Sequence, residues 1–558
     1  MLLYSMVRIA QGDVRTWRRQ PDQLTRSPDS LLPTSRQGCG RASIGVQGHQ
    51  DGSVTSLALD RHANTEQLEH VGSDGRMASD KGAASAVRGS AGLFALGPAN
   101  GCRAPGFISF VLAYVAFFAV GWWAWERRSG LTSLDWYVSA AWTLPVLTSS
   151  MGLAGGLRTA HRLRRRSRPP VPLAVEDMLV VVVPTIGRRD TFPALERVVR
   201  SFCRELPCYF PRLRIDLVIE EACQARNEII GLTDPSIRVI TIPQDYQTPS
   251  GTRFKARANH YAHTLRLAAE EARDDVWVLH MDDDTGVGSD TAQELARFVS
   301  SQQSAGKQAL HLAQGVLCFP REYADNRLTW LADAVRPGCD VGLFAATTGR
   351  GTPRAGLHGE LLLVRASVEA TIGWDFGPRA IVEDAQFALC FCERYPGRSG
   401  WIPGRSYGAS PASVGDFIRQ RERWVWGLLE LATDRKVPLR RRLLLIHNVA
   451  VWSCAAVAHP AVVLLVGVIA GDVHAKPASA VLVPLWALNM AFCAWLYWEG
   501  LKLNGGSSAR PRPLWRERLC LVVLAPLFSA WEVAGISCGL ARFLKRGEPR
   551  FTVIRKPS

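Results

Sequence analysis

The stretch Val276–Asp284, VWVLHMDDD, constrains the fold of this chain most, because six mostly apolar residues run directly into three aspartates. An apolar run of this kind is typical of a strand buried on both faces. Side chains alternate along an extended chain, so Asp282 and Asp284 are predicted to point one way and Asp283 the other. Two carboxylates at the carboxyl end of a strand are hard oxygen ligands for Mg²⁺ or Mn²⁺. The alternative is an acidic turn that caps the next helix.

Strands and helices alternate on both sides of this stretch, between residues 173 and 439. The predicted strands are Leu179–Val183, Arg214–Ile219, Ile237–Ile242 and Val276–Met281, and the predicted helices include Asp190–Phe202 and Lys255–Ala272. This alternation predicts a doubly wound α/β sheet, which binds ligands at the carboxyl ends of its strands. Two strands end in acids, at Glu220 and Asp282. That pattern suits a nucleotide, with one acid for the base or ribose and the others for a metal-bridged diphosphate.

A second acidic pair opens the segment Ala380–Cys392, where Glu383 and Asp384 precede a helical apolar pattern. Acids in the first turn of a helix interact favourably with its dipole, which is a purely structural explanation of the pair. The functional alternative is a general base held near a sugar acceptor.

The segment Ser413–Lys436 is predicted to be an amphipathic helix that begins with a cap of Ser413 and Asp416. Gln420, Arg423 and Trp424 are spaced so that they share one face of this helix. Arg423 is expected to bind a leaving diphosphate, and Trp424 is expected to line an acceptor site. The alternative is an interfacial helix lying on a membrane with its arginines toward the headgroups, and the two interpretations are compatible.

The charge balance is basic, with 66 Lys and Arg against 50 Asp and Glu among 558 residues. Such a balance suits nucleic acid or an anionic membrane, and the hydropathy favours the membrane and argues against nucleic acid. Apolar runs predict five membrane-spanning stretches, at 107–125, 136–157, about 447–470, 478–498 and 519–541. The basic cluster Arg158–Arg168 places the following domain in the cytoplasm by the positive-inside rule. Glu532, inside the last stretch, is expected to face protein rather than lipid.

These features predict a multi-pass protein of the cell membrane with a cytoplasmic catalytic domain. The expected parts are a disordered tail (1–104), two membrane helices with a basic linker (105–168), the catalytic domain (173–439), further membrane helices (443–545) and a C-terminal tail (546–558). Three crossings after the domain conflict with the basic character of the C-terminal tail, which leaves the side of the C-terminus open. The 13 cysteines lack zinc spacing and are expected to be unpaired thiols in a reducing compartment.

The combination of these motifs resembles family 2 glycosyltransferases that are processive or act on lipid acceptors. It comprises Pro184-Thr185 after the first strand, an acid after the second, the DDD triplet, the later Glu383-Asp384 pair, and Gln420, Arg423 and Trp424 as QxxRW. Four stretches are more specifically similar to the egghead-type glycolipid β-1,4-mannosyltransferases: PQDYQTPSGTRFKARANHY (243–261), VLHMDDDT (278–285), VED (382–384) and SPASVGDFIRQRERWVWG (410–427). The resemblance covers residues 180–558. The DDD triplet stands where that family has an acidic series such as DEE, and Glu220 stands where an aspartate is common, so the carboxylates are kept and the donor is left open.

The resemblance implies a GT-A fold and a role for each matching residue. Thr185 and Glu220 would contact the nucleotide, and Lys255 and Arg257 would lie near the donor phosphates. Asp282 and Asp284 would bracket Mg²⁺ or Mn²⁺ and the diphosphate. Asp384 would be the catalytic base with Glu383 beside it, Gly359 would border the acceptor pocket, and Gln420, Arg423 and Trp424 would shape the acceptor and leaving-group site.

The implied function is an inverting, metal-dependent membrane glycosyltransferase that uses a nucleotide-sugar donor, GDP-mannose being favoured, and a glycolipid or lipid-linked acceptor. A single base suffices, because one displacement at the anomeric carbon turns an α-linked donor into a β-glycoside. One alternative is a processive polysaccharide synthase of the cellulose- or hyaluronan-synthase kind with a UDP-sugar donor. Another, of a different class, is a non-catalytic membrane scaffold.

Overall fold

The computed structural model describes residues 102–126, 135–136, 139, 141, 143–165, 171–172, 174–457, 479–508 and 513–546. The expected N-terminal tail lies outside the described residues except for its last three positions, and so does nearly all of the C-terminal tail. The middle of the third apolar stretch, with the expected kink at His459-Pro460, lies outside them as well. The cysteines that the structure describes are all free thiols, as expected.

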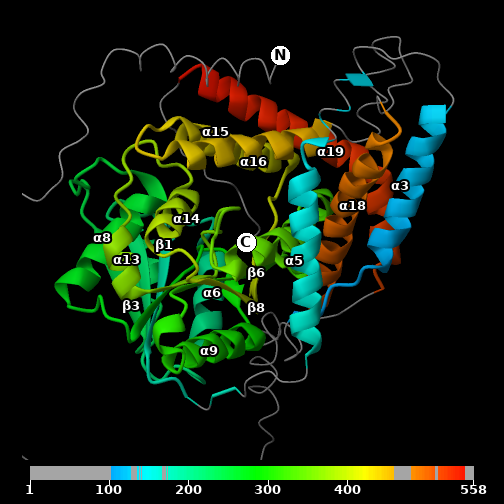
Figure 1. The fold of residues 1–558 in the computed structure, drawn as a ribbon. Coiled ribbons are helices and arrows are strands. Elements are labelled where there is room, and N and C mark those ends of the chain that lie inside the picture. Colours follow the sequence, from blue (N-terminus) through cyan, green and yellow to red (C-terminus); the bar gives the residue numbers. More distant parts are fainter. Residues whose placement is uncertain are drawn as a thin grey trace, which may run out of the picture. The chain divides into compact units, whose positions relative to one another are not determined.

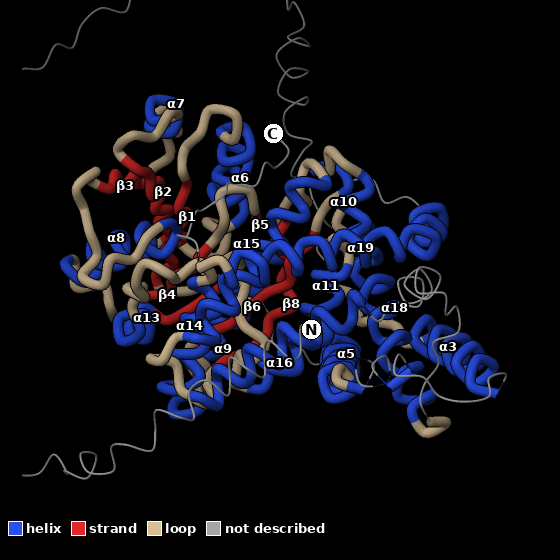
Figure 2. Tube along the Cα trace, turned by 90° about the horizontal axis from the view of Figure 1, so that it is seen from above, coloured by secondary structure: helices blue, strands red, loops and turns tan. Residues whose placement is uncertain are grey.

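The described part of the chain is built on one eight-stranded sheet in the order β3-β2-β1-β4-β7-β6-β8-β5. Its parallel half comprises β1 (Met178–Thr185), β2 (Leu213–Glu220), β3 (Ile237–Ile242) and β4 (Val276–His280). The other half comprises β5 (Gly286–Val287), β6 (Leu312–Cys318), β7 (Leu362–Arg365) and β8 (Ser399–Tyr407). Figure 2 shows the strands in red passing from β3 at one edge to β5 and β8 at the other.

The α/β prediction is confirmed, but the sheet is mixed rather than parallel throughout. The four predicted strands are β1 to β4, and Val181 pairs in parallel register with both Ile215 and Leu279. Strand β7 runs antiparallel to both β4 and β6, and β5 runs antiparallel to β8. Strands β6 and β8 contain polar or helix-breaking residues such as Gln314 and Pro403, and β7 has only four residues, so this half lacks the mostly apolar runs that mark the first four strands.

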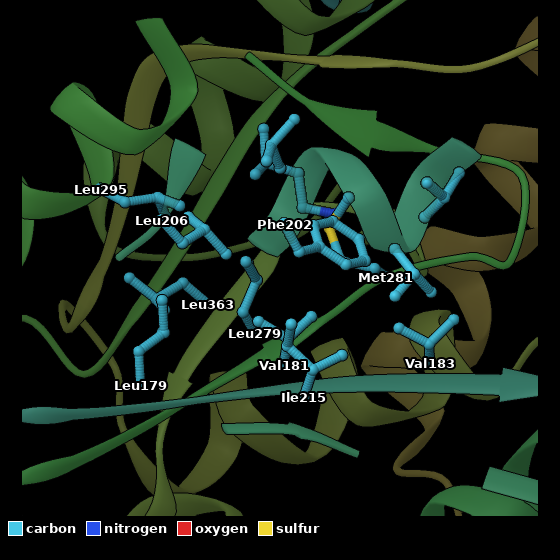
Figure 3. Packing of buried hydrophobic residues seen from close by; sticks show 14 of the residues in the cluster. Leu179, Val181, Val183, Phe202, Leu206, Ile215, Leu279, Met281, Leu295 and Leu363 are labelled. Atoms are coloured by element: carbon cyan, nitrogen blue, oxygen red, sulfur yellow. The ribbon is translucent and has the colours of Figure 1, made fainter. Parts of the chain in front are cut away.

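Helices cover both faces of the sheet. Leu179, Val181 and Val183 of β1 pack with α6 (Phe192–Glu205) and α9 (Ser289–Gln303), and Figure 3 shows Phe202 of α6 above this face. The alternate residues Val180 and Val182 pack on the other side with α8 (Phe254–Ala268), α13 (Ala366–Ile372) and α14 (Glu383–Arg394). The strand that carries the aspartates is therefore buried on both faces, as its apolar sequence predicts.

The remaining helices lie N- and C-terminal to this domain or connect its strands. The long ones are α3 (Ile108–Glu126), α5 (Val146–Arg164), α15 (Val414–Thr433), α16 (Leu439–Val457), α18 (Leu482–Gly506) and α19 (Trp515–Leu544). The short ones are α7 (Arg226–Ile230), α10 (Arg327–Ala332), α11 (Val335–Cys339), the π-helix η4 (Asp340–Phe344) and α12 (Ala345–Thr347), besides three 3₁₀ turns, η2 (Gly306–Gln308), η3 (Arg321–Tyr323) and η5 (Thr348–Arg350). Helix α18 packs against α3 and α5 (Figure 1).

Among the described residues, two helices are long and apolar enough to cross a membrane, α3 and α19. Five apolar stretches were expected, so a full set of membrane helices is only partly supported. Helix α5 contains the basic cluster from Arg158 to Arg164 rather than ending before it, which lowers its hydropathy. Helix α18 buries much of its surface against other helices, including Trp486 and Trp495.

A buried ionic network contacts the end of β4, the strand that precedes the three aspartates. The carboxylate of Glu369 accepts hydrogen bonds from Arg266 at 2.7 Å, from Trp374 at 2.7 Å, and pairs with His280 Nε2 at 2.8 Å. His280 is the last residue of β4, two positions before Asp282. Burial alone would raise the pKa of Glu369, but Arg266 and the histidine hydrogen bonds outweigh it and lower the pKa well below its ordinary value.

Replacing Glu369 with glutamine is expected to cost about 3–5 kcal/mol of unfolding free energy, because it leaves the guanidinium of Arg266 buried without a counter-charge. Urea unfolding in detergent measures this loss. The native contribution should be present above the ordinary pKa of a glutamate and disappear on acidification, since the folded-state pKa is lowered. Glu196→Gln is the matched control, because its pair with Arg200 is largely exposed and should matter little. Equal stability of the two variants would contradict this account.

Candidate active site

The three aspartates lie in a turn beyond the end of β4, so the alternation of an extended chain does not govern them. The carboxylate of Asp282 pairs with Lys255 Nζ. Asp283 accepts a hydrogen bond from Thr185 Oγ1 at 2.7 Å, and Asp284 Oδ1 accepts one from Thr285 Oγ1 at 3.1 Å. The acidic cluster is therefore tied to β1 through Asp283 and to α8 through Asp282.

Thr185 and Glu220 end the adjacent strands β1 and β2, at the same sheet edge as the aspartates. Glu220 forms an ion pair with Arg257 Nη1 at 2.5 Å. The same guanidinium donates to the backbone carbonyls of Pro243 and Tyr246 at 3.0 and 3.1 Å. The structure thus brings Glu220 and Arg257 together, two residues that the sequence motifs place at different parts of a nucleotide. Their roles toward a nucleotide stay predictions.

Lys255 lies between the two acidic groups of the site. Besides Asp282, its Nζ donates to the Gly359 carbonyl at 3.2 Å and approaches Glu383 Oε1 at 4.0 Å. Burial would lower its pKa, but the charges of Asp282 and Glu383 outweigh burial and raise it. The preceding residue, Phe254, adopts a left-handed φ of 59°, a strained conformation for a residue with a side chain. Because the pKa of Lys255 is raised, its ammonium stays charged, and it links Asp282 to the acid pair through Glu383.

Glu383 and Asp384 occupy the first turn of α14, as the sequence predicts. Burial and the neighbouring charge of Asp384 raise the pKa of Glu383 to about 7, against the opposing effect of Lys255. Burial also raises the pKa of Asp384, while Lys255 and the backbone N–H of Ala385, 2.7 Å from Oδ1, oppose the rise. Carboxyl groups with raised pKa values are suited to proton transfer near neutral pH.

Helix α15 presents Arg423 and Trp424 to this cluster. Burial lowers the pKa of Arg423, and the charges of Glu383, Asp282 and Asp384 act against that effect, so the guanidinium lies within range of the acids. The guanidinium carbons of Arg336 and Arg421 each lie 4.9 Å from the centroid of the Trp424 ring. Gln420 is buried and accepts a hydrogen bond from Arg421 at 2.6 Å. The predicted cap is confirmed, since Ser413 Oγ accepts from the N–H of Asp416 at 3.1 Å.

Four further side chains border the site and were not predicted from the sequence. His358 Nε2 lies 2.6 Å from Asp340 Oδ1, and Arg336 Nη2 donates to Glu360 Oε1 at 3.0 Å. Burial would lower the pKa of His358, but Asp340 outweighs it and raises the pKa. His358 and Glu360 stand on either side of Gly359, and this position is the sequence signal that could have found these two residues.

The donor set of the site fits a hard divalent cation. Its carboxylates are oxygen ligands of the kind that Mg²⁺ and Mn²⁺ prefer. No group of three or more His, Cys, Asp or Glu side chains in the described residues is arranged to hold a metal by itself. A cation held by Asp282 and Asp284 would therefore need further oxygen ligands, such as those of a diphosphate.

Residues 277–498 match the family model described as Glycosyl transferase family group 2. The match contains the aspartate triplet, Glu383-Asp384 and the Gln420–Trp424 motif. This part of the chain is thus similar to family 2 glycosyltransferases, as the motifs predict.

Two relatives with similar sequences are both β-1,4-mannosyltransferases. The chain is 30% identical over 269 residues to the β-1,4-mannosyltransferase egh of Drosophila melanogaster, which is 47% of this chain and 55% of that protein. It is 26% identical over 228 residues to the β-1,4-mannosyltransferase bre-3 of Caenorhabditis elegans, which is 39% of this chain and 47% of that protein. The chain spans about half the length of these relatives. The resemblance to the egghead type is thereby confirmed.

Among solved structures, the mannosyltransferase PcManGT from Pyrobaculum calidifontis, in complex with GDP-Man and Mn²⁺, is similar with a TM-score of 0.41 and 16% identity. The similarity covers 73% of this chain and 99% of that protein.

Replacing Gly359 with alanine is expected to lower sugar transfer by about 10-fold, because a Cβ there would lie 2.5 Å from Lys255 Nζ and displace the ammonium. The lysine end is flexible, so the melting temperature should change little. Initial rates and thermal unfolding measure the two effects. Gly415→Ala is the matched control, since its Cβ would meet only ordinary contacts at 3.8 Å. Wild-type rates in Gly359→Ala would contradict the assigned packing.

Proposed function

We propose that the protein is an inverting membrane glycosyltransferase that transfers one sugar, mannose from GDP-mannose being favoured, to a glycolipid or lipid-linked acceptor. The contact that carries this proposal is Lys255, which joins Asp282 at the end of β4 to Glu383 at the start of α14. A nucleotide-sugar transferase needs a diphosphate site and a base within one sugar ring of each other, and this contact brings the two together. The similarity to β-1,4-mannosyltransferases supports the choice of sugar.

The chemistry follows from the charges in the site. Asp384 would take the proton from the acceptor hydroxyl while that oxygen attacks the anomeric carbon. Arg423 and Lys255, which lie near these acids, would offset the negative charge that develops on the leaving diphosphate. Mg²⁺ or Mn²⁺ at Asp282 and Asp284 would supply further charge neutralisation as a Lewis acid. Attack opposite to the leaving group inverts the configuration, so the product would be a β-glycoside.

The acceptor side of the proposal rests on the apolar helices. Helices α3 and α19 are candidates to cross a membrane, and both expose large apolar side chains such as Val115 and Val523. A multi-pass protein of the cell membrane with its site on the cytoplasmic side would meet lipid-borne hydroxyl groups there. The membrane would then orient the acceptor, which is a large part of the work in a bimolecular transfer.

Donor turnover in membranes that contain the protein tests this proposal. GDP-mannose, UDP-glucose, UDP-GlcNAc and UDP-galactose are compared with Mg²⁺, with Mn²⁺ and with EDTA. Transfer from GDP-mannose alone, lost in EDTA, is the expected result. Turnover of a UDP-sugar with a long polymer product would instead identify a polysaccharide synthase. Absence of turnover and of metal-dependent donor binding would favour the non-catalytic scaffold.

A further inference from the structure

Arg421 of α15 is a fully buried arginine that contacts three different parts of the chain. Its side chain is 1% exposed. It donates to Gln420 Oε1 at 2.6 Å, to Asp333 Oδ1 at 2.6 Å and to Glu532 Oε1 at 3.0 Å. Asp333 directly follows α10, and Glu532 lies in the middle of α19. One guanidinium therefore joins the family motif on α15 to a helix that is apolar enough to cross a membrane.

Helix α19 approaches α15 unusually closely at this point. A Cβ at Gly535 would lie 2.5 Å from the Cβ of Arg421, and one at Gly539 would lie 2.8 Å from the Glu422 carbonyl oxygen. Trp452 of α16 donates to the second oxygen of Glu532 at 3.1 Å. Figure 1 shows α15 and α19 side by side, in agreement with these contacts. The charge of Glu532 faces protein, as the sequence predicts.

The contacts of Arg421 continue toward the acids of the candidate site. Its guanidinium lies over the ring of Trp424, and that ring also contacts Arg336. Arg336 in turn pairs with Glu360, which is adjacent to Gly359 and its contact with Lys255. Arg423, two residues along the helix, lies within range of the charges of Glu383 and Asp384. A shift of α15 against α19 would therefore move Arg423 and Trp424 relative to the acid pair.

We propose that Arg421 is a positioning residue that makes the seating of α19 on α15 a condition for an assembled transfer site. Loss of the guanidinium would leave Asp333 and Glu532 as buried carboxylates without their counter-charge, which favours separation of the two helices. Misplacement of reacting groups by about 1 Å costs up to about 100-fold in rate. The effect on transfer rests on the function proposed above, whereas the helix contact itself does not.

The test compares Arg421→Gln with Arg421→Lys and with Arg542→Gln. Arg542 forms a second ion pair between α19 and α15, with Glu422 at 2.6 Å, and this pair is partly exposed, so it is the comparison for the buried pair of Arg421. Arg421→Gln is expected to raise the acceptor KM and lower kcat, together by about 10- to 100-fold, with the donor KM nearly unchanged. Arg421→Lys should recover part of the loss, because it keeps the charge without the guanidinium fork. A smaller loss is expected in Arg542→Gln, because its ion pair is partly exposed. Wild-type constants in Arg421→Gln would overturn the proposal.

Thermal unfolding separates a failure of this inference from a failure of the proposed function. If the wild type transfers no sugar, the proposed function is wrong, and the helix contact is then read from Arg421→Gln, Glu532→Gln and the double variant. One shared network predicts that the double variant unfolds at a temperature close to that of the less stable single variant. Additive losses of unfolding temperature would show that Arg421 and Glu532 do not belong to one network. Gly535→Ala, which keeps every charge, is the second route when Arg421→Gln does not fold, and it should show the same rise in acceptor KM.

Discussion

Asp384→Asn is expected to lower the rate of sugar transfer by about 10²–10⁴-fold, the usual contribution of a general base. Asparagine has nearly the shape of aspartate and keeps an oxygen to accept the N–H of Ala385, but it cannot take a proton. The fold should therefore survive, and the loss should appear in kcat. Initial rates in membranes, normalised to folded protein, measure the effect. Wild-type transfer by this variant would end the assignment of Asp384 as the base.

The pH dependence separates Asp384 from its neighbour. A base works only when deprotonated, so the rate should rise with pH as Asp384, whose pKa is raised by burial, loses its proton. Glu383, with a pKa of about 7, adds a second ionisation near neutrality, so Glu383→Gln should keep the rise that belongs to Asp384 and retain much more activity than Asp384→Asn. The reverse order, with Glu383→Gln inactive and Asp384→Asn active, would transfer the role of base to Glu383.

Lys255→Met is expected to have the second-largest effect, a loss of about 10²–10³-fold, comparable with removal of one preorganised electrostatic partner of the transition state. The lysine charge lowers the pKa values of both Glu383 and Asp384, so its removal should raise them. The acid limb of the pH–rate profile should then move to higher pH, because the base stays protonated longer. A full profile of kcat against pH measures this shift.

Two controls accompany that profile. Lys307→Met removes an exposed lysine and should leave both rate and profile unchanged. Lys255→Arg keeps a positive charge and should recover part of the activity with a smaller shift of the limb. A profile for Lys255→Met that coincides with that of the wild type would show that the lysine does not act on the acid pair.

The first half of the sheet was predictable from the sequence because its strands are mostly apolar and rich in Val and Ile. Strands β6 and β8 escaped prediction, since Gln314 and Pro403 interrupt their apolar pattern, and β7 is only four residues long, so pairing with distant strands is what makes them strands. The residue types of the site were likewise readable. Aspartates after a strand, acids opening a helix and a QxxRW helix are local patterns of polar residues against an apolar background.

The partners of the charged residues were decided only by the tertiary structure. The sequence indicates Lys255 and Arg257 as cations for a diphosphate, yet the fold sets Lys255 between Asp282 and Glu383 and pairs Arg257 with Glu220. It also sets Arg421, rather than Arg423, on Gln420 and on Glu532. The physical reason is distance. Hydrophobic period and capping act over a few neighbouring residues and are written in the sequence. An ion pair acts over a few ångströms between segments that are distant in the sequence, and only the packing of the sheet and helices brings those segments together.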